Sequence, residues 1–148
     1  MKRLGTVICF LLVAAVSALA ADSIYGVWRM RPDPHAQGVK DQVVTVEPSG
    51  GGVKFSYDID LGSQHIQYEF ITKMDGVRVP AISHGQEIMK VWVKKISSTE
   101  YDSGSSAGAT ETKFKGIISP DGKTWTTDGT IKTGNQSIAS HVVFDKVK

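Results

Sequence analysis

Cysteine is nearly absent from this 148-residue sequence: the one cysteine, Cys9, lies inside an apolar run at the N-terminus. The rest of the chain therefore has no partner with which to form a disulfide. Its fold must be stabilised by burial of apolar side chains and by backbone hydrogen bonds. A small scaffold held together by disulfides is excluded.

Helical periodicity is also missing. After residue 21, no stretch repeats apolar residues at helical spacing over three turns, and no segment recurs at a fixed period. Helical bundles, α/β folds and repeat arrays are excluded on this ground, which leaves an all-β fold.

The sequence has little excess of charge of either sign. The formal net charge is +2, and it comes from Lys2 and Arg3 at the N-terminus. Residues 21–148 are close to neutral. The chain therefore has no electrostatic attraction for nucleic acid, and we predict no nucleic-acid partner.

Catalytic signatures are missing as well. The sequence holds no nucleophile elbow, no phosphate-binding loop and no dinucleotide fingerprint in its proper context. None of its four histidines has zinc-ligand spacing to another (His35, His65, His84 and His141). We predict no catalytic residue, no metal site and no cofactor. An enzyme would need titratable groups that converge inside the fold, such as His141 facing inward beside a carboxylate.

The N-terminus does contain the three parts of a secretory signal. "MKR" is basic, "LGTVICFLLVAAVSALA" is apolar, and Ala18 to Ala20 place small residues where signal peptidase cleaves. We predict a signal peptide at residues 1–20 and one domain at residues 21–148. The alternative is a retained membrane anchor, because Leu4 to Ala21 approaches the lower length limit for crossing a bilayer.

A cleaved signal predicts a secreted or periplasmic protein with no transmembrane segment in residues 21–148. An exported chain without disulfides is more typical of a bacterial envelope than of a eukaryotic secreted scaffold. The sequence carries no sign of its oligomeric state.

The domain is a series of short alternating runs separated by turn residues. Asp75-Gly76, Asp121-Gly122 and Gly134-Asn135 are dipeptides typical of hairpin turns. Successive hairpins with short links predict a single antiparallel up-and-down β-barrel of about eight to ten strands, with no helical lid. The strand number stays open because "VRVP" and "YDSGSSAG" are ambiguous.

Alternation along the strands predicts which side chains face the interior. Segments 53–59, 66–70 and 89–93 carry apolar and aromatic residues on one face. Later strands mix hydroxyls into that face, as where Phe114 shares it with Thr110 and Thr112. The interior is therefore predicted to be apolar in its first half and partly polar in its second. The candidate ligand-contacting residues are Phe55, Tyr57, Tyr68, Phe70, Met89 and Val91.

Arg78 is a further candidate for ligand binding. The segment "VRVPAISHG" could cover one mouth of the barrel, where the Arg78 guanidinium would bind a ligand carboxylate. The other interpretation is an exposed arginine in a loop. A barrel of this size is either filled by its own side chains or holds one small ligand, and the sequence leaves both open.

The stretch "GVW" carries a family resemblance. Gly26 allows a bend or a close backbone approach, and Trp28 lies on the same strand face, where it can plug one end of a barrel. This pattern resembles the G-x-W signature of lipocalins and the wider calycin group, which includes fatty-acid-binding proteins and avidins. The layout most resembles small secreted lipocalin-like bacterial proteins of unknown function. Shared features are the "GVW" start, a Pro-containing loop, "VTVEPSGGGVKF", "YEFITKMDG" and "ISPDGKTWT".

The resemblance implies barrel architecture and carriage of a ligand. Two features differ. Fatty-acid-binding proteins insert two helices after the first strand, whereas only "RPDPHAQGVK" separates the strands here. Lipocalins usually add a helix after the barrel, and no helix candidate follows the last predicted strand here. They also place a basic residue near the last strand, stacked on the tryptophan, for which Lys146 and Lys148 are the only late candidates.

Two functions are carried forward. The first is a secreted barrel that binds a small, largely apolar molecule in its interior. The alternative is a non-catalytic envelope or interaction protein with a filled barrel that binds partners through its outer surface. An exposed aromatic cluster around Trp92 and Trp125 would mark such a surface. An enzyme built on the barrel ranks well behind both.

Overall fold

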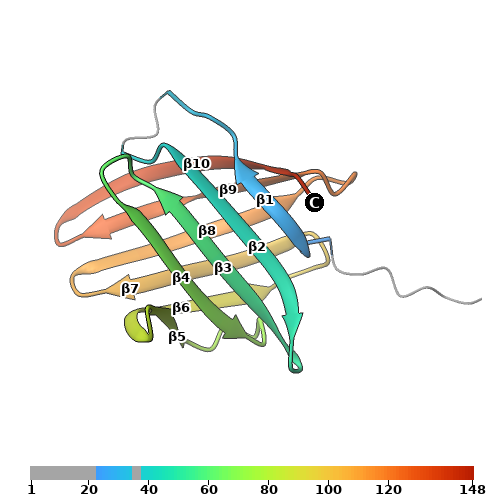
Figure 1. Cartoon of the computed structure of the whole chain (residues 1–148), viewed down its shortest axis with the longest axis horizontal. Helices are drawn as coiled ribbons and strands as arrows, with labels where there is room; N and C mark the ends of the chain where they lie inside the picture. The colour runs from blue at the N-terminus through green and yellow to red at the C-terminus, as the bar shows by residue number, and fades with distance from the viewer. Residues whose placement is uncertain (1–22, 35–37) are drawn as a thin grey trace, which may run out of the picture.

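The computed structural model describes residues 23–34 and 38–148. They form one closed barrel in which each strand pairs with its neighbours in the chain (Figure 1). The predicted antiparallel up-and-down barrel is confirmed, and its strand number is ten. Both ambiguous segments contribute to strands: "VRVP" through its last two residues, and "YDSGSSAG" along nearly all of its length. The strands are β1 (Gly26–Met30), β2 (Asp41–Ser49), β3 (Gly52–Asp60), β4 (His65–Thr72), β5 (Val79–Ser83), β6 (Gln86–Lys95), β7 (Glu100–Ala107), β8 (Thr110–Ile118), β9 (Thr124–Thr133) and β10 (Gln136–Lys146).

The described residues contain no helix. In this part of the chain, accordingly, no helix is long and apolar enough to cross a bilayer. The predicted signal peptide at residues 1–20 lies outside the described residues and stays a prediction.

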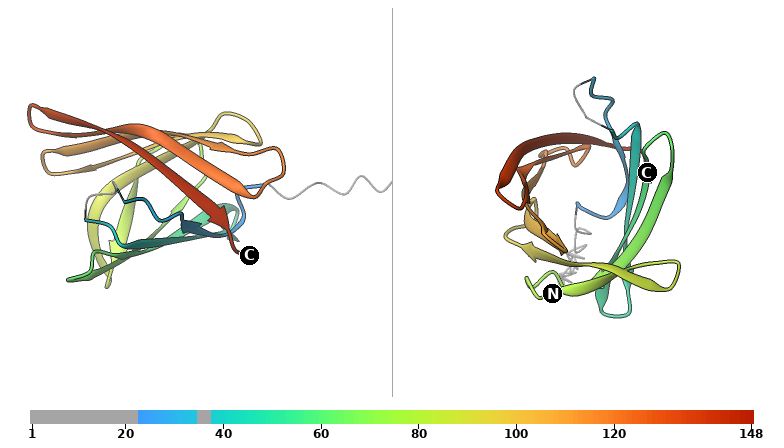
Figure 2. Two further views of the ribbon diagram at one scale, coloured as in Figure 1. Left: turned by 90° about the horizontal axis from the view of Figure 1, so that it is seen from above. Right: turned by 90° about the vertical axis from the view of Figure 1, so that its left-hand side faces the viewer.

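Strand β1 closes the barrel because it pairs with both β2 and β10. Two bidentate ion pairs hold this short strand on either side. Arg29 binds Asp41 of β2 with a shortest contact of 2.6 Å, and Arg31 binds Asp145 of β10 with the same shortest contact. The hydrogen bonds from these arginines lower the pKa of the Asp41 and Asp145 carboxyls. Figure 2 shows the resulting ring of strands when the molecule is viewed from one end.

One end of the barrel, here called the closed end, holds the most completely buried side chains. Odd-numbered strands start there and even-numbered strands finish there. The Trp28 and Trp125 rings meet edge to face, with centroids 5.7 Å apart, and Phe144 lies 5.3 Å from Trp125. Ile24 and Tyr101 are fully buried beside them. These aromatic contacts plug the closed end.

Position 26 requires a glycine for two reasons: its backbone conformation and the atoms packed against it. Its φ is +136°, a conformation that L side chains rarely adopt. A Cβ at this position would overlap the Lys148 carbonyl oxygen and lie 2.6 Å from Lys146 Cε. Val27 N–H donates to that same Lys148 carbonyl, at 2.8 Å. The glycine of "GVW" therefore lets the end of the chain pair against β1.

The ladder between β4 and β5 is the weakest in the barrel. Only one register pair, Glu69 with Ile82, joins the two strands. Pro80, which would stand opposite Ile71, has no N–H to donate, and the β5–β6 register shifts between Ala81 and Ile82. The 73–78 connection instead pairs with β6, through Gly76 N–H to the Val93 carbonyl at 2.9 Å.

Candidate ligand-binding site

Burial decreases from the closed end of the barrel to the other end, here called the open half. Phe55, Phe70 and Val91 are buried, whereas Tyr57, Tyr68 and Met89 on the same inward faces are half-buried. At the tip of β10, the inward-facing Ile138 is 61% exposed. Residues 132–139 around it are all exposed, so this hairpin tip extends beyond the buried interior. Burial is therefore complete at the closed end of the barrel and partial in the open half.

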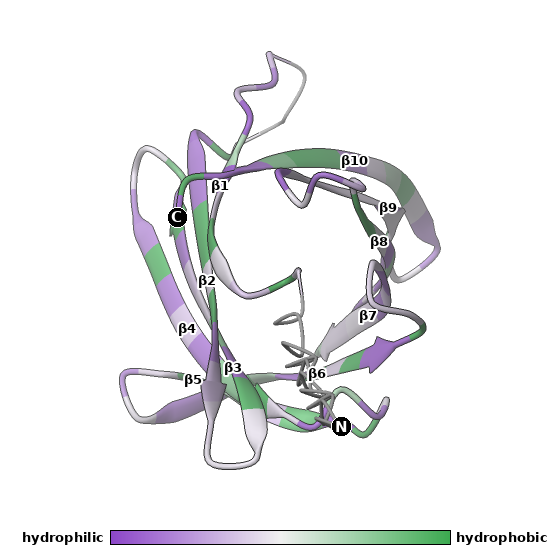
Figure 3. Cartoon of the chain, turned by 90° about the vertical axis from the view of Figure 1, so that its right-hand side faces the viewer, coloured by the Kyte–Doolittle hydropathy of each residue, from purple (hydrophilic) through white to green (hydrophobic). Residues whose placement is uncertain are grey.

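Strands β2 to β4 form what we call the aromatic wall: the inward-facing residues Val44, Val46, Val53, Phe55, Tyr57, Tyr68 and Phe70. Phe55 and Phe70 stack with centroids 5.1 Å apart, and Tyr57 and Tyr68 stack at 4.8 Å. Both pairs are direct cross-strand partners in the β3–β4 register. Figure 3 shows the underlying alternation, with hydrophobic and hydrophilic segments following one another along β4.

Burial raises the pKa of both phenols in this wall. For Tyr68, the neighbouring Tyr57 raises the pKa further. Both side chains are therefore neutral hydrogen-bonding groups at physiological pH.

Strands β7 to β10 form what we call the hydroxyl wall. Register pairs place Ser105 opposite Thr112, Gly116 opposite Thr127, and Ser140 opposite Gly129, all facing inward. Ser105 Oγ and Thr112 Oγ1 lie 2.7 Å apart. The prediction of an apolar first half and a partly polar second half is confirmed. The wall consists of Ser103, Ser105, Thr112, Gly116, Thr127, Gly129 and Ser140, interrupted by Tyr101, Phe114, Trp125, Phe144 and a few aliphatic residues.

Glycines in the hydroxyl wall lie under aromatic rings. Phe114 is the direct cross-strand partner of Gly129, and a Cβ on Gly129 would lie 2.6 Å from Phe114 Cδ1. A Cβ on Gly116 would lie 2.5 Å from Trp125 Nε1. Atoms of these two rings therefore occupy the space that a side chain at the glycine of the neighbouring strand would need.

The two interior tryptophans differ in their polar contacts. Trp28 Nε1 donates to the Ile24 carbonyl at 2.8 Å, and Lys146 Nζ lies 5.0 Å from the centroid of the Trp28 ring. Of the two late basic candidates, Lys146 is the one that lies over this tryptophan. Trp125 Nε1 is the one buried side-chain nitrogen or oxygen without a hydrogen-bond partner among the residues the structure describes.

Six of the seven predicted ligand-contacting residues share the barrel interior. Phe55, Phe70 and Val91 belong to its buried layer, and Tyr57, Tyr68 and Met89 lie nearer the opening. Arg78 is not with them. Its Nη1 donates to Ser106 Oγ at 2.7 Å, and both residues are on the outer face of the barrel. The structure therefore gives Arg78 no place beside a ligand in the interior.

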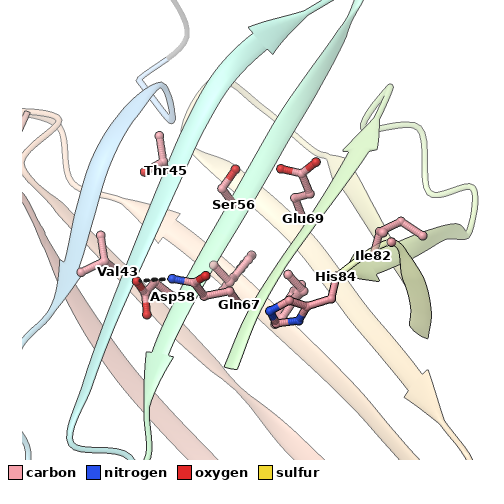
Figure 4. A pocket seen from close by; sticks show the side chains of 11 residues that line it. Val43, Thr45, Ser56, Asp58, Gln67, Glu69, Ile82 and His84 are labelled. Atoms are coloured by element: carbon pink, nitrogen blue, oxygen red, sulfur yellow. Dashed lines mark hydrogen bonds between the residues drawn. The ribbon is translucent and has the colours of Figure 1, made fainter. Parts of the chain in front are cut away.

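The outer face carries a shallow groove of about 540 Å³ over β2, β3 and β4 (Figure 4). Asp58 and Gln67 are joined there by a 3.0 Å hydrogen bond, and His84 overhangs the groove from the β5–β6 turn. A second hollow, of about 200 Å³, lies where Met30 meets Val142 at the β1–β10 junction.

The described histidines lie outside the barrel interior. His141 pairs with Asp128, both exposed, on the outer face, and His65 pairs with Asp58 and Asp60. His35 falls outside the described residues. No group of three or more His, Cys, Asp or Glu residues among the described ones could hold a metal ion. The inward-facing histidine and carboxylate that an enzyme would need are not brought together in this part of the chain.

The tryptophans expected to mark an outer interaction surface are on opposite faces. Trp125 is buried in the core, while Trp92 is half-buried and lies over Gly104 on the outer face. The two indoles form no common cluster.

Sequence reasoning missed the paired Ser105 and Thr112 hydroxyls and the glycines beneath the aromatic rings. One signal was available: glycines within strands that carry aromatic residues often mark a ring lying across the neighbouring strand. Finding the partner requires the register, because Gly116 and Trp125 are on different strands.

No protein-family model matches the sequence, and no curated protein matches it significantly. Solved structures share its fold. A Schistosoma mansoni fatty acid binding protein in complex with arachidonic acid gives a TM-score of 0.56 at 14% identity, over 85% of this chain and 97% of that chain. A mutant of the fluorescent protein UnaG gives 0.55 at 10% identity, over 85% and 97%. Wild-type UnaG gives 0.52 at 12% identity, over 84% and 98%.

These identities show a common fold and nothing finer. What the chain shares with the fatty acid binding protein and with UnaG is the barrel fold.

Proposed function

We propose that this protein binds a small, largely apolar molecule in the open half of its barrel. The observation that carries the proposal is that Tyr57, Tyr68 and Met89 face inward and yet stay partly exposed. Apolar surface that a folded protein leaves exposed in a concave position is typical of a ligand site. A structural neighbour whose title names a bound fatty acid supports the same function.

We further propose that the protein works outside the cytoplasm, as a bacterial lipocalin-like carrier. The support is the signal-like stretch at residues 1–20, the "GVW" start and the position of Lys146 over Trp28.

The direct test is native mass spectrometry of the chain secreted from a bacterial host, before and after denaturation. A bound mass that disappears on unfolding is expected and gives the ligand's class. A bare protein that also takes up no added apolar molecule would remove the proposal.

Two neighbouring variants sharpen this test. Ser105→Trp places an indole inside the open half, whereas Ser106→Trp places one on the outer face of the same strand. Ser105→Trp is expected to abolish uptake and Ser106→Trp to leave it intact, with both variants showing a cooperative unfolding transition. Equal uptake by both variants would place the ligand elsewhere.

The alternative is a non-catalytic interaction protein that binds a partner through its outer surface. The groove over β2 to β4 is the observation in its favour. Substituting Ser56→Trp would fill that groove without entering the barrel. Loss of a partner with this variant, together with a bare barrel in mass spectrometry, would favour the alternative.

A further inference from the structure

The Ser105 and Thr112 hydroxyls provide a hydrogen-bonding position inside the open half. Their oxygens lie 2.7 Å apart across the β7–β8 pair, and both side chains are half-buried. Each hydroxyl has one donor and two acceptor lone pairs. Their mutual bond uses one donor and one lone pair, so the pair keeps one O–H donor and several lone pairs for another molecule.

Aliphatic side chains flank this pair in the same cross-strand row. Val91 is the register partner of Ser105 on one side, and Ile131 is the register partner of Thr112 on the other. The hydroxyls are thus a polar position within an apolar row. A ligand in contact with this row would lay apolar surface on Val91 and Ile131 and direct a polar group at the hydroxyls.

The other polar side chains that face the open half from the described strands are neutral. They include the Tyr57 and Tyr68 phenols, the Gln42 amide and the hydroxyls of Ser103, Thr110, Thr127, Thr133 and Ser140. Within the described strands, the register places inward-facing ammonium groups only at the closed end.

These ammonium groups are Lys95 and Lys146. Lys146 is held by the Ser23 carbonyl at 3.0 Å and by the ring of Trp28. A carboxylate in the open half would therefore lie among neutral groups, and removing an unpaired charge from water is unfavourable.

We infer that the ligand of the open half is uncharged and carries a hydroxyl, carbonyl or amide group that hydrogen-bonds to Ser105 and Thr112. The inference rests on the proposed function, because it specifies the ligand of the same site. It sets this barrel apart from a carrier of free fatty acid anions.

The test compares three molecules that have the same number of carbon atoms: a long-chain fatty acid, the corresponding alcohol and the corresponding alkane. Binding of each is measured at neutral pH by displacement of a neutral, environment-sensitive dye from the whole domain. The alcohol is expected to bind at least about tenfold more tightly than the acid, because only the acid carries a charge to desolvate. The alcohol should also exceed the alkane, about fivefold, because of its hydrogen bond.

The outcomes separate the two proposals. Equal or tighter binding of the acid overturns the inference and leaves the proposed function in place. If the dye, the acid, the alcohol and the alkane all fail to bind, the proposed function is wrong, and the inference is wrong with it.

Removing the hydroxyls provides the second measurement. Ser105→Ala combined with Thr112→Val keeps the shape of the row and deletes both groups. This variant should lose the preference for alcohol over alkane while binding the alkane as the parent does. Thr130→Val, on the outer face of β9, is the matched control and should keep the preference. A preference that survives in the double variant would overturn the assignment to this pair.

Discussion

The aromatic wall and the hydroxyl wall occupy the interior of one barrel in opposite ways. In the aromatic wall, Phe55 stacks on Phe70 and Tyr57 on Tyr68, so large rings stand inward from neighbouring strands. In the hydroxyl wall, small residues face inward, and the Phe114 ring lies over Gly129. In the open half, the aromatic wall carries Tyr57 and Tyr68, where the hydroxyl wall carries Ser105 and Thr112. The difference shows that the two sides of one closed sheet can present side chains of different size and polarity without a change in strand number.

The largest expected difference between the walls is in stability. Phe70→Ala removes a buried, stacked ring and should cost about 3–5 kcal/mol of unfolding free energy. Phe114→Ala removes a half-buried ring and should cost clearly less, about 1–2 kcal/mol, because part of its surface already meets solvent. Urea denaturation of both variants measures the difference. Equal losses would mean that the hydroxyl wall is packed as tightly as the aromatic wall.

The two tryptophans at the closed end allow a finer comparison. Trp28→Phe loses the hydrogen bond to the Ile24 carbonyl and the contact with Lys146, whereas Trp125→Phe removes an N–H that has no partner. Trp28→Phe should therefore be the more destabilising by about 1–2 kcal/mol. Thermal unfolding of the two variants tests this. A larger loss for Trp125→Phe would indicate that its indole N–H has a partner in solution.

The smallest expected effect is a dependence on alkaline pH that belongs to the aromatic wall. Burial raises the pKa of Tyr57 and Tyr68 in the folded state, so the unfolded chain loses these protons first, near pH 10. Their contribution to stability is unchanged below about pH 9 and is lost as the pH rises above about 10. Denaturation at a series of pH values should show this loss. It should shrink in the Tyr57→Phe, Tyr68→Phe double variant, and an unchanged slope would contradict the burial of both phenols.

Much of the fold could be predicted from local features of the sequence. Two-residue alternation marks the strands, and turn dipeptides such as Gly134-Asn135 mark the hairpins between them, because both depend on neighbouring residues in the chain. The interior faces of β3 and β4 follow from the same alternation. Six of the predicted ligand-contacting residues therefore lie inside the barrel.

The candidate site was less predictable because it depends on cross-strand register. Ser105 meets Thr112, and Gly116 receives the ring of Trp125, only once β7, β8 and β9 are aligned. A shift of one residue in register would turn every one of these side chains to the other face. The position of Arg78 was unpredictable for the same reason, because its place outside the barrel follows from the pairing of β6 with β7.

The sequence by itself determined that the chain is all-β, where its strands run and which faces are apolar. These properties arise from contacts between residues close together in the chain. The tertiary structure decided that ten strands close into a ring, that Lys146 covers Trp28, and that burial is complete at one end and partial at the other. Closure requires β1 to pair with β2 and with β10 at once, and β10 lies at the far end of the chain. Such distant contacts depend on the geometry of the whole sheet, and local pattern does not encode them.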